Sequence, residues 1–130
     1  MMKDKTSPIL GLGNDIIEIE RIRQSLEEHH DKFLNKLFSP LEQTYCLKHA
    51  DPAPHLAGRF AAKEAIAKAF GLGFGKEIGF LDIEIVNDSL GKPVVHFSEN
   101  LKSKMQGSDV MISISHCRSF AIATAVWAKC

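Results

Sequence analysis

The sequence has few cysteines and no excess of charge of either sign. The three cysteines, Cys46, Cys117 and Cys130, are odd in number and show no Cys-x-x-Cys spacing. This argues against a disulfide framework and against a zinc site, and favours reduced thiols. The 16 basic residues balance 16 acidic ones, so a protein that binds nucleic acid or a membrane surface through its overall charge is disfavoured. A local basic patch remains compatible with this balance.

Long hydrophobic runs are also absent from the sequence. No apolar stretch approaches the roughly 18 to 20 residues that a membrane span needs. The N-terminal segment MMKDKTSPILGLG has too few consecutive apolar residues for the hydrophobic part of a secretion signal. We therefore expect a cytoplasmic protein that does not enter a membrane.

The composition is that of one globular domain. Of the 130 residues, 45% are hydrophobic and 25% are charged, and we find no internal repeat, low-complexity tract or linker. At this length folding buries about two-thirds of the surface of the unfolded chain, which is enough for a hydrophobic core. We expect a single domain over residues 1–130.

Hydrophobic periodicity and turn residues predict the order of the elements. Most strands are joined by hairpins, so the predicted class is α+β, with a largely antiparallel sheet packed against helices. The clearest local signal is SPLEQTYCLKHA, where Ser39 is a good N-cap and Glu42 completes a capping box. The other predicted elements are a strand over 9–19, helices over 18–29, 31–37 and 55–70, strands over 80–86 and 94–97, a short helix over 98–105, and strands over 109–115 and 120–128.

The segment RFAAKEAIAKAFGLG (residues 59–73) predicts a helix with two apolar faces and four ions, of which Lys63 falls on the bulky apolar side and Glu64 and Lys68 on the flank between the faces. Its bulky side chains fall on one side of a helical wheel and its alanines on the other, a pattern typical of a buried helix. Burying an unpaired charge costs several kcal/mol, so these ions need partners. The four ions are Arg59, Lys63, Glu64 and Lys68.

Two interpretations of these ions remain open at this point. In the structural one, Glu64 and Lys68 form an i, i+4 ion pair while Arg59 and Lys63 extend to the surface. In the functional one, the carboxylate holds Mg²⁺ and the cations meet the phosphates of a polyanionic ligand.

A second carboxylate for such a site is available in GLGNDI. Asp15 follows a strand that contains glycines, where backbone can approach a ligand closely. The alternative is that Gly-Asn-Asp is simply a turn with a helix cap. The spacing alone does not show whether Asp15 meets Glu64.

The segment SISHCRS places His116 at the end of an apolar strand, at a hairpin tip. Its imidazole, or the hydroxyl of Ser115, is able to donate to a phosphate, and the alternative is an ordinary surface histidine. A nucleophilic pair with Cys117 is disfavoured, because adjacent strand residues point to opposite faces. The glycines of GLGFG are a weak phosphate-loop signal, since the Gly-Lys-Ser/Thr of a P-loop is missing.

Four segments taken together resemble one family. GLGNDIIEIERI, RFAAKEAIAKAFGLG, FLDIEIVNDSLGKP and ISISHCRSFAIA occur in the order found in the holo-acyl-carrier-protein synthases, and they cover nearly the whole chain. These are the small bacterial-type 4′-phosphopantetheinyl transferases, and the resemblance implies their fold. It also implies a homotrimer with active sites at the subunit interfaces.

The resemblance implies a specific reaction. The phosphopantetheine arm of coenzyme A is transferred to a serine of an acyl carrier protein in support of fatty acid biosynthesis, adenosine 3′,5′-bisphosphate leaves, and Mg²⁺ is required. The family's metal carboxylates correspond to Asp15 and Glu64, and its catalytic lysine to Lys68. We take Glu64, acting through a metal-bound water, as the candidate base for the serine proton.

The resemblance also assigns binding residues. The residues that would bind coenzyme A are Lys63, Lys68, Gly71, Gly73, Ser115 and His116, with His116 placed to meet the ribose 3′-phosphate. The residues that would bind the acidic carrier are Arg21, Lys32 and Lys36. Two other functions remain as alternatives: a module that binds coenzyme A without chemistry, and a metal-dependent phosphohydrolase.

Overall fold

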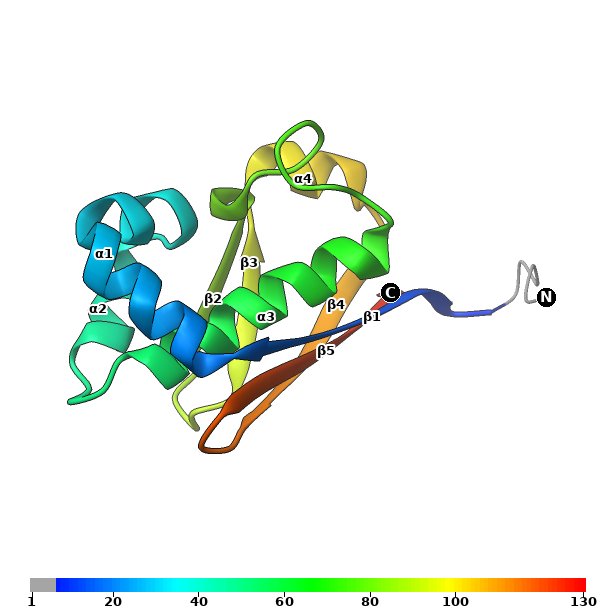
Figure 1. The fold of residues 1–130 in the computed structure, drawn as a ribbon. Helices are drawn as coiled ribbons and strands as arrows, with labels where there is room; N and C mark the ends of the chain where they lie inside the picture. The colour runs from blue at the N-terminus through cyan, green and yellow to red at the C-terminus, as the bar shows by residue number, and fades with distance from the viewer. Residues whose placement is uncertain (1–6) are drawn as a thin grey trace.

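The computed structural model describes residues 7–130, so residues 1–6 of the expected domain lie outside it (Figure 1). The α+β class and the predicted order of the elements are confirmed. The elements are β1 (Ile9–Glu18), α1 (Ile19–Leu37), α2 (Pro40–Leu47), α3 (Ala53–Phe70), a 3₁₀ turn (Phe80–Asp82), β2 (Ile83–Asn87), β3 (Pro93–Phe97), α4 (Glu99–Lys104), β4 (Ser108–His116) and β5 (Phe120–Lys129).

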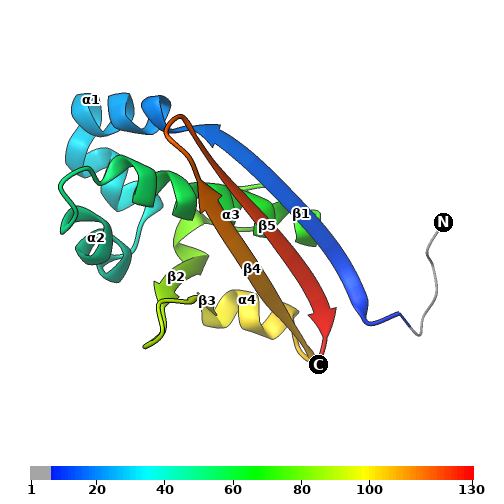
Figure 2. The ribbon, with the colours of Figure 1, turned by 90° about the horizontal axis from the view of Figure 1, so that it is seen from below.

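The strands form two antiparallel sheets, where the sequence led us to expect one. A three-stranded sheet has the order β1-β5-β4, and β2 and β3 form a separate hairpin. In the larger sheet Asp15 of β1 lies opposite Ala123 of β5, and Ser115 of β4 lies opposite Ile122. Figure 2 shows the three strands side by side with α3 behind them.

The helix α3 lies closely against the larger sheet because both contact surfaces carry small residues. Ala121, Ala123 and Ala125 of β5 are fully or almost fully buried. On β1, a Cβ added to Gly11 or Gly13 would collide with the backbone of α3, at the carbonyl oxygens of Ala69 and Ala65 respectively. The glycines of GLGNDI therefore serve the close approach of a strand to a helix.

Several element boundaries differ from the prediction for local reasons. The two helices expected over 18–29 and 31–37 are continuous in α1 apart from a kink at His30, which has non-helical dihedrals (φ 7°, ψ −92°). The helix α3 begins at Ala53, two residues early, because Pro54 is tolerated in the first turn of a helix. The segment 80–82 forms a 3₁₀ turn, so β2 begins at Ile83.

The predicted start of α2 is confirmed in detail. The amide of Glu42 donates to Ser39 Oγ (3.3 Å), and the amide of Ser39 donates to Glu42 Oε1 (2.8 Å). Two of the free backbone donors at this helix end are thereby satisfied, as in a capping box. Among the helices within residues 7–130, none has the length and apolar character needed to cross a membrane.

Candidate functional site

The structure brings Asp15, Glu64 and Lys68 together where β1 crosses α3. Asp15 lies two residues beyond Gly13, at which the strand touches the helix. Lys68 Nζ donates to Asp15 Oδ1 and to the carbonyl of Asn14, both at 3.0 Å. The ion pair of Lys68 is therefore formed with β1, and the i, i+4 pair with Glu64 is not among the ion pairs of residues 7–130.

The environment of Glu64 favours its neutral form. Partial burial raises the pKa of the carboxyl group, the negative charge of Asp15 raises it further, and Lys68 opposes the shift. The two carboxylates thus repel one another across the site. A divalent cation between them would remove this repulsion, because each oxygen would then face a positive charge.

The donor set fits a magnesium ion that also binds its substrate. Mg²⁺ prefers oxygen ligands and is commonly held by one or two carboxylates together with waters and phosphate oxygens. Asp15 and Glu64 supply two such carboxylates. No group of three or more His, Cys, Asp or Glu side chains suited to a metal exists within residues 7–130. The other positions around the ion would therefore come from substrate and water.

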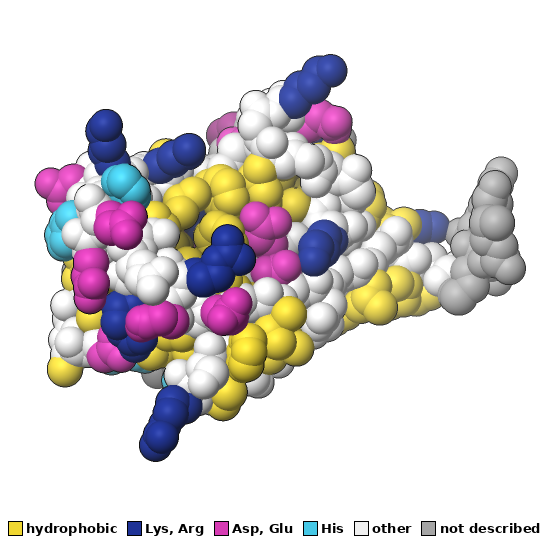
Figure 3. Space-filling model, in the orientation of Figure 1, with side chains coloured by type: hydrophobic (Ala, Val, Ile, Leu, Met, Phe, Trp, Pro, Cys, Tyr) yellow, Lys and Arg dark blue, Asp and Glu magenta, His cyan; other side chains and the backbone are white. Residues whose placement is uncertain are grey.

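The two carboxylates border a pocket of about 320 Å³ between β1, α1 and α3. Arg21 of α1 lines the same pocket. The remaining lining is Ile16, Ile17, Ile22, Ser25, Phe33 and Phe60. On the face shown in Figure 3, acidic and basic side chains lie next to one another beside an apolar area near the middle of the molecule.

Lys63 corrects one prediction. Its side chain is completely buried, and Nζ donates to Glu42 Oε1 (2.8 Å), to the carbonyl of Leu37 (2.7 Å) and to that of Phe80 (3.0 Å). An ammonium group has three hydrogens, and all three are used. The assignment of Lys63 to coenzyme A is therefore wrong, and the residue ties α3 to α1, α2 and the 3₁₀ turn.

Glu42 is the partner of Lys63. The sequence predicted its role in the capping box but not this second role as the partner of a buried lysine. Glu42 is fully buried, and Oε2 accepts a hydrogen bond from the amide of Ile85 (2.8 Å). The pKa of Lys63 is lowered, because the effect of burial outweighs the opposing effect of the charge on Glu42. The capping-box pattern predicted the local bonds of Glu42, but no local pattern predicts a partner on a distant helix.

Arg59 also lies in the interior. Its side chain is 5% exposed, its guanidinium donates to Asn87 Oδ1 (2.8 Å), and it lies over the ring of Tyr45 (4.3 Å from the centroid). The Nε atom is buried and has no hydrogen-bond partner. Arg59 therefore does not extend to the surface as the structural interpretation of the sequence supposed.

Ser115 and His116 lie apart from the carboxylates within this chain. Ile114 contacts Gly58 of α3, so its neighbour Ser115 faces the other side of the sheet. His116 points back toward α3, where its ring meets that of His55 (6.1 Å between centroids). His55 and Glu64 are nine residues apart, which is about 13 Å along a helix.

The two predicted glycines lie where α3 ends. Gly71 has a left-handed conformation (φ 72°), and its amide donates to the carbonyl of Lys68 (3.1 Å). An added Cβ at Gly71 or Gly73 would meet nothing within 4 Å. Both glycines are exposed one turn beyond Lys68, so this loop borders the site without filling it.

The predicted carrier residues follow the exposed side of α1. Arg21 lines the carboxylate pocket, whereas Lys32 and Lys36 line a neighbouring apolar hollow of about 410 Å³. Phe33 and Phe60 border both cavities, which makes them adjacent. The three cations thus line two adjacent cavities, one of which contains Asp15 and Glu64.

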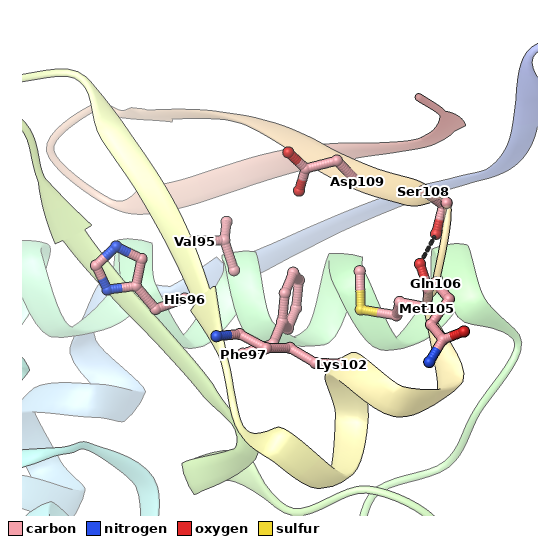
Figure 4. A pocket seen from close by; sticks show the side chains of 9 residues that line it. Val95, His96, Phe97, Lys102, Met105, Gln106, Ser108 and Asp109 are labelled. Atoms are coloured by element: carbon pink, nitrogen blue, oxygen red, sulfur yellow. Dashed lines mark hydrogen bonds between the residues drawn. The ribbon is translucent and has the colours of Figure 1, made fainter.

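A further pocket of about 350 Å³ lies between β3, α4 and β4 (Figure 4). Its lining includes His96, Lys102 and one carboxylate, Asp109. Ser108, also in the lining, donates to the carbonyl of Met105 (2.6 Å) and accepts from Trp127 Nε1 (2.8 Å). With a single carboxylate and its hydroxyl already engaged, the pocket offers no second metal site.

Comparison with known proteins places these features in one family. Residues 11–125 match the model of the 4′-phosphopantetheinyl transferase superfamily. Among curated proteins, the chain is 53% identical over 120 residues to a holo-[acyl-carrier-protein] synthase of Protochlamydia amoebophila (strain UWE25), covering 92% of this chain and 98% of that one. The synthase of Chlamydia pneumoniae is 47% identical over 118 residues, covering 91% of this chain and 96% of that protein.

Solved structures agree with the sequence relatives. A holo-(acyl-carrier-protein) synthase from Bacillus anthracis, in complex with coenzyme A (3′,5′-ADP), has a TM-score of 0.82 at 40% identity and covers 95% of this chain and 100% of that one. The synthase of Helicobacter pylori, in complex with coenzyme A, has a TM-score of 0.83 at 37% identity, covering 90% of this chain and 99% of that one. The resemblance found in the sequence is thereby confirmed.

Proposed function

Because this chain belongs to the 4′-phosphopantetheinyl transferase superfamily, we propose that it is a holo-acyl-carrier-protein synthase. It transfers the 4′-phosphopantetheine group of coenzyme A to a serine of apo-acyl carrier protein. The observation that carries this function is the 53% identity, over almost the full length of both chains, to a relative of that name. The proximity of Lys68 to Asp15, and of Asp15 to Glu64 at one pocket, supports the proposal that the reaction takes place there.

The proposed reaction is a displacement at phosphorus. The serine oxygen of the carrier bonds to the β-phosphorus of coenzyme A, the bond from that phosphorus to the bridging oxygen breaks, and adenosine 3′,5′-bisphosphate leaves. Mg²⁺, held by Asp15 and Glu64, would neutralise charge on the pyrophosphate. Lys68 has a side chain that is 54% exposed, and the hydrogen of its ammonium group that neither Asp15 nor Asn14 accepts could bind an oxygen of the leaving group.

Glu64 is the proposed acceptor of the serine proton. With Mg²⁺ held by the same carboxylate, Glu64 would take this proton through a water bound to the metal. The residue borders the pocket that Arg21 also lines. A carrier held by Arg21, Lys32 and Lys36 would thus present its serine to this pocket, and its acidic surface would be attracted to these cations.

Coenzyme A, which donates the phosphopantetheine group, is bound through residues at both ends of α3. Gly71 and Gly73 leave backbone exposed beside Lys68, and His116 lies at the other end, next to His55. Ser115 faces the opposite side of the sheet from α3, where a second copy of the chain would be needed to complete a site. We propose that donor contacts are shared between subunits.

The outer face of the larger sheet supports a homotrimer. Leu12 and Ile16 of β1 and Met111 of β4 are 67%, 59% and 65% exposed, although all three are apolar. Contiguous apolar surface of this kind is typical of a protein interface. We propose that three copies join through this face in the cytoplasm, with active sites between neighbouring subunits.

Mass spectrometry of the carrier tests the function directly. The protein is incubated with coenzyme A, Mg²⁺ and apo-acyl carrier protein, and the expected product is a carrier that has gained one phosphopantetheine. Addition of EDTA is expected to stop the gain. Tight binding of coenzyme A without any gain would favour the binding module, and bisphosphate release in the absence of carrier would favour the phosphohydrolase.

A further inference from the structure

The ammonium group of Lys68 already pairs with Asp15, one of the two proposed metal ligands. Lys68 Nζ lies 3.0 Å from Asp15 Oδ1 and 3.0 Å from the carbonyl oxygen of Asn14. Among residues 7–130, Lys68 is the cation that forms an ion pair with Asp15. The charge of Asp15 is thereby balanced by a lysine of the same chain.

Two neighbouring elements fix the strand segment that carries both acceptors of Lys68. The side-chain amide of Asn14 donates to the carbonyl of Ala123 (3.2 Å) and to Thr124 Oγ1 (2.9 Å), both in β5. On the other side, Gly13 lies against the backbone of α3. The carbonyl of Asn14 therefore cannot follow a lysine that moves, and Lys68 loses both hydrogen bonds when it turns away from β1.

The charge of Lys68 acts on both proposed metal ligands. Besides its ion pair with Asp15, it affects Glu64: burial and the charge of Asp15 raise the pKa of Glu64, and the charge of Lys68 opposes this rise. Charges in partly buried surroundings interact more strongly than charges in water. A divalent cation that enters between Asp15 and Glu64 would therefore be repelled by Lys68.

A count of charges shows which ligand removes this repulsion. The two carboxylates carry two negative charges and Lys68 carries one positive charge, so a bound Mg²⁺ would leave one positive charge in excess. Arg21, which lines the same pocket, adds a further positive charge. The pyrophosphate of coenzyme A supplies two negative charges, and its oxygens are good partners for both a lysine and Mg²⁺.

We propose that Lys68 acts as the counter-ion of Asp15 until coenzyme A binds, and that its transfer to the pyrophosphate makes Mg²⁺ and coenzyme A bind cooperatively. An oxygen of the pyrophosphate binds the third hydrogen of the ammonium group, draws the group away from Asp15 and leaves the carboxylate to the metal. The inference rests on the proposed function, which assigns Asp15 and Glu64 to Mg²⁺ and Lys68 to coenzyme A. Its new content is that Lys68 opposes binding of the metal to the free protein.

Binding of Mn²⁺ tests this competition without any turnover. Carboxylate oxygens bind Mn²⁺ as they bind Mg²⁺, and the electron paramagnetic resonance signal of free Mn²⁺ measures how much metal remains unbound. For the wild type we expect coenzyme A, added without carrier, to strengthen Mn²⁺ binding by about tenfold or more. Mn²⁺ held by coenzyme A alone is subtracted by a titration without protein. A Mn²⁺ affinity that coenzyme A leaves unchanged would overturn the proposal.

Lys68→Met separates this competition from ordinary phosphate binding. The variant lacks the positive charge beside Asp15, so in the absence of coenzyme A it should bind Mn²⁺ about tenfold more tightly than the wild type does. A lysine that served only the phosphate would leave this affinity unchanged, and that result would overturn the proposal. Lys76→Met removes the same charge from the exposed loop after α3, and this matched control should bind Mn²⁺ as the wild type does.

Two more variants test whether the effect depends on the charge and on this site. Lys68→Arg keeps the positive charge and should bind Mn²⁺ alone as weakly as the wild type, whereas binding as tight as that of Lys68→Met would contradict a competition between charges. Asp15→Asn, shown to be folded by circular dichroism, should bind Mn²⁺ far more weakly with or without coenzyme A. Wild-type binding by Asp15→Asn would place the ion elsewhere and overturn the proposal.

Calorimetry of coenzyme A provides the reciprocal measurement. Coupling between two ligands is mutual, so Mn²⁺ should strengthen the binding of coenzyme A by the same factor by which coenzyme A strengthens the binding of Mn²⁺. In Lys68→Met this factor should be smaller. Absence of phosphopantetheine transfer by the wild type would count against the proposed function. Transfer by the wild type, together with equal Mn²⁺ affinities of the wild type and Lys68→Met, would count against this inference alone.

Discussion

At the scale of the residue, the charged side chains of α3 have different partners and different surroundings. Lys68 pairs with Asp15 of β1, Lys63 with Glu42 of α2, and Glu64 borders the carboxylate pocket. The sequence predicted that these charges need partners, and Asp15 and Glu64, which the resemblance assigned to one metal, line the same pocket. The resemblance misassigned Lys63 to coenzyme A. A helical wheel shows how side chains are arranged around one helix, but it does not show that Glu42, 21 residues away in the sequence, lies next to Lys63 in the fold.

The first prediction concerns the carboxylate of Glu64. Glu64→Gln keeps the shape of the side chain but removes the charge that would hold the metal and the oxygen that would take the proton. We expect a loss of transfer of at least about 100-fold, measured by mass spectrometry of the carrier. Glu77→Gln, in the exposed loop after α3, is the control, and normal turnover by Glu64→Gln would show that the assigned role is wrong.

The second prediction concerns the buried ammonium group. Lys63→Met leaves Glu42 without its partner in the interior, and breaking a buried pair in this way costs about 3–5 kcal/mol. Urea denaturation should show the loss. If the variant instead unfolds like the wild type and only its KM for coenzyme A rises, Lys63 binds substrate after all. Lys76→Met, in an exposed loop, serves as the control.

The third prediction links Mg²⁺ to pH through the raised pKa of Glu64. The folded protein without metal holds this proton to a higher pH than the unfolded chain does. Its contribution to stability is therefore complete below the ordinary glutamate pKa of 4.5 and is lost as the pH rises through the raised value. Mg²⁺ should raise the thermal midpoint more at pH 7.5 than at pH 5, as measured by calorimetry. An equal rise for Glu64→Gln would contradict the metal site.

At the scale of the element, the contact between β1 and α3 decides where Asp15 lies. The glycines of GLGNDI were recognised in the sequence as places where backbone approaches closely, but the expected neighbour was a ligand. The neighbour is the backbone of α3 at Ala65 and Ala69. Local patterns predicted nearly every helix and strand. They could not predict that β1 pairs with β5 or that the strands divide into two sheets, since both depend on contacts between distant residues.

The fourth prediction tests this contact. In Gly13→Ala the new methyl group meets the carbonyl of Ala65, and neither backbone segment can yield without moving Asp15 from Lys68. We expect a loss of about 1–3 kcal/mol in stability and a fall in kcat, measured by thermal unfolding and by carrier assay. Gly79→Ala is the control, because its Cβ would make only an ordinary contact with Asp82. Wild-type behaviour of Gly13→Ala would contradict the close approach.

At the scale of the whole molecule, the larger sheet has two unlike faces. One is covered by α3, and the other exposes Leu12, Ile16 and Met111. The alternation of apolar and polar residues in these strands is imperfect, because the outer face is also apolar. For this reason the sequence did not distinguish a face that meets a helix from a face available to another subunit.

The fifth prediction concerns that outer face. Leu12→Asp places a charge where the proposed trimer would bury it, and desolvating an unpaired charge is costly. We expect the trimer to dissociate and transfer to fall, as measured by light scattering coupled to size exclusion and by the carrier assay. Leu90→Asp, at a position that is 92% exposed in the turn between β2 and β3, should remain trimeric. A trimeric Leu12→Asp would place the interface elsewhere.

The pairing of β1 with β5 also determines when the first strand can take its place in the sheet during synthesis. In the described part of the chain, β1 has β5 as its strand neighbour, and Asp15 lies opposite Ala123. In a nascent chain Asp15 therefore leaves the ribosome well before Ala123, the residue that lies opposite it. Pairing of such distant segments is slow to form. Asp15 should therefore reach its final position only after β5 has been synthesised and has paired with β1.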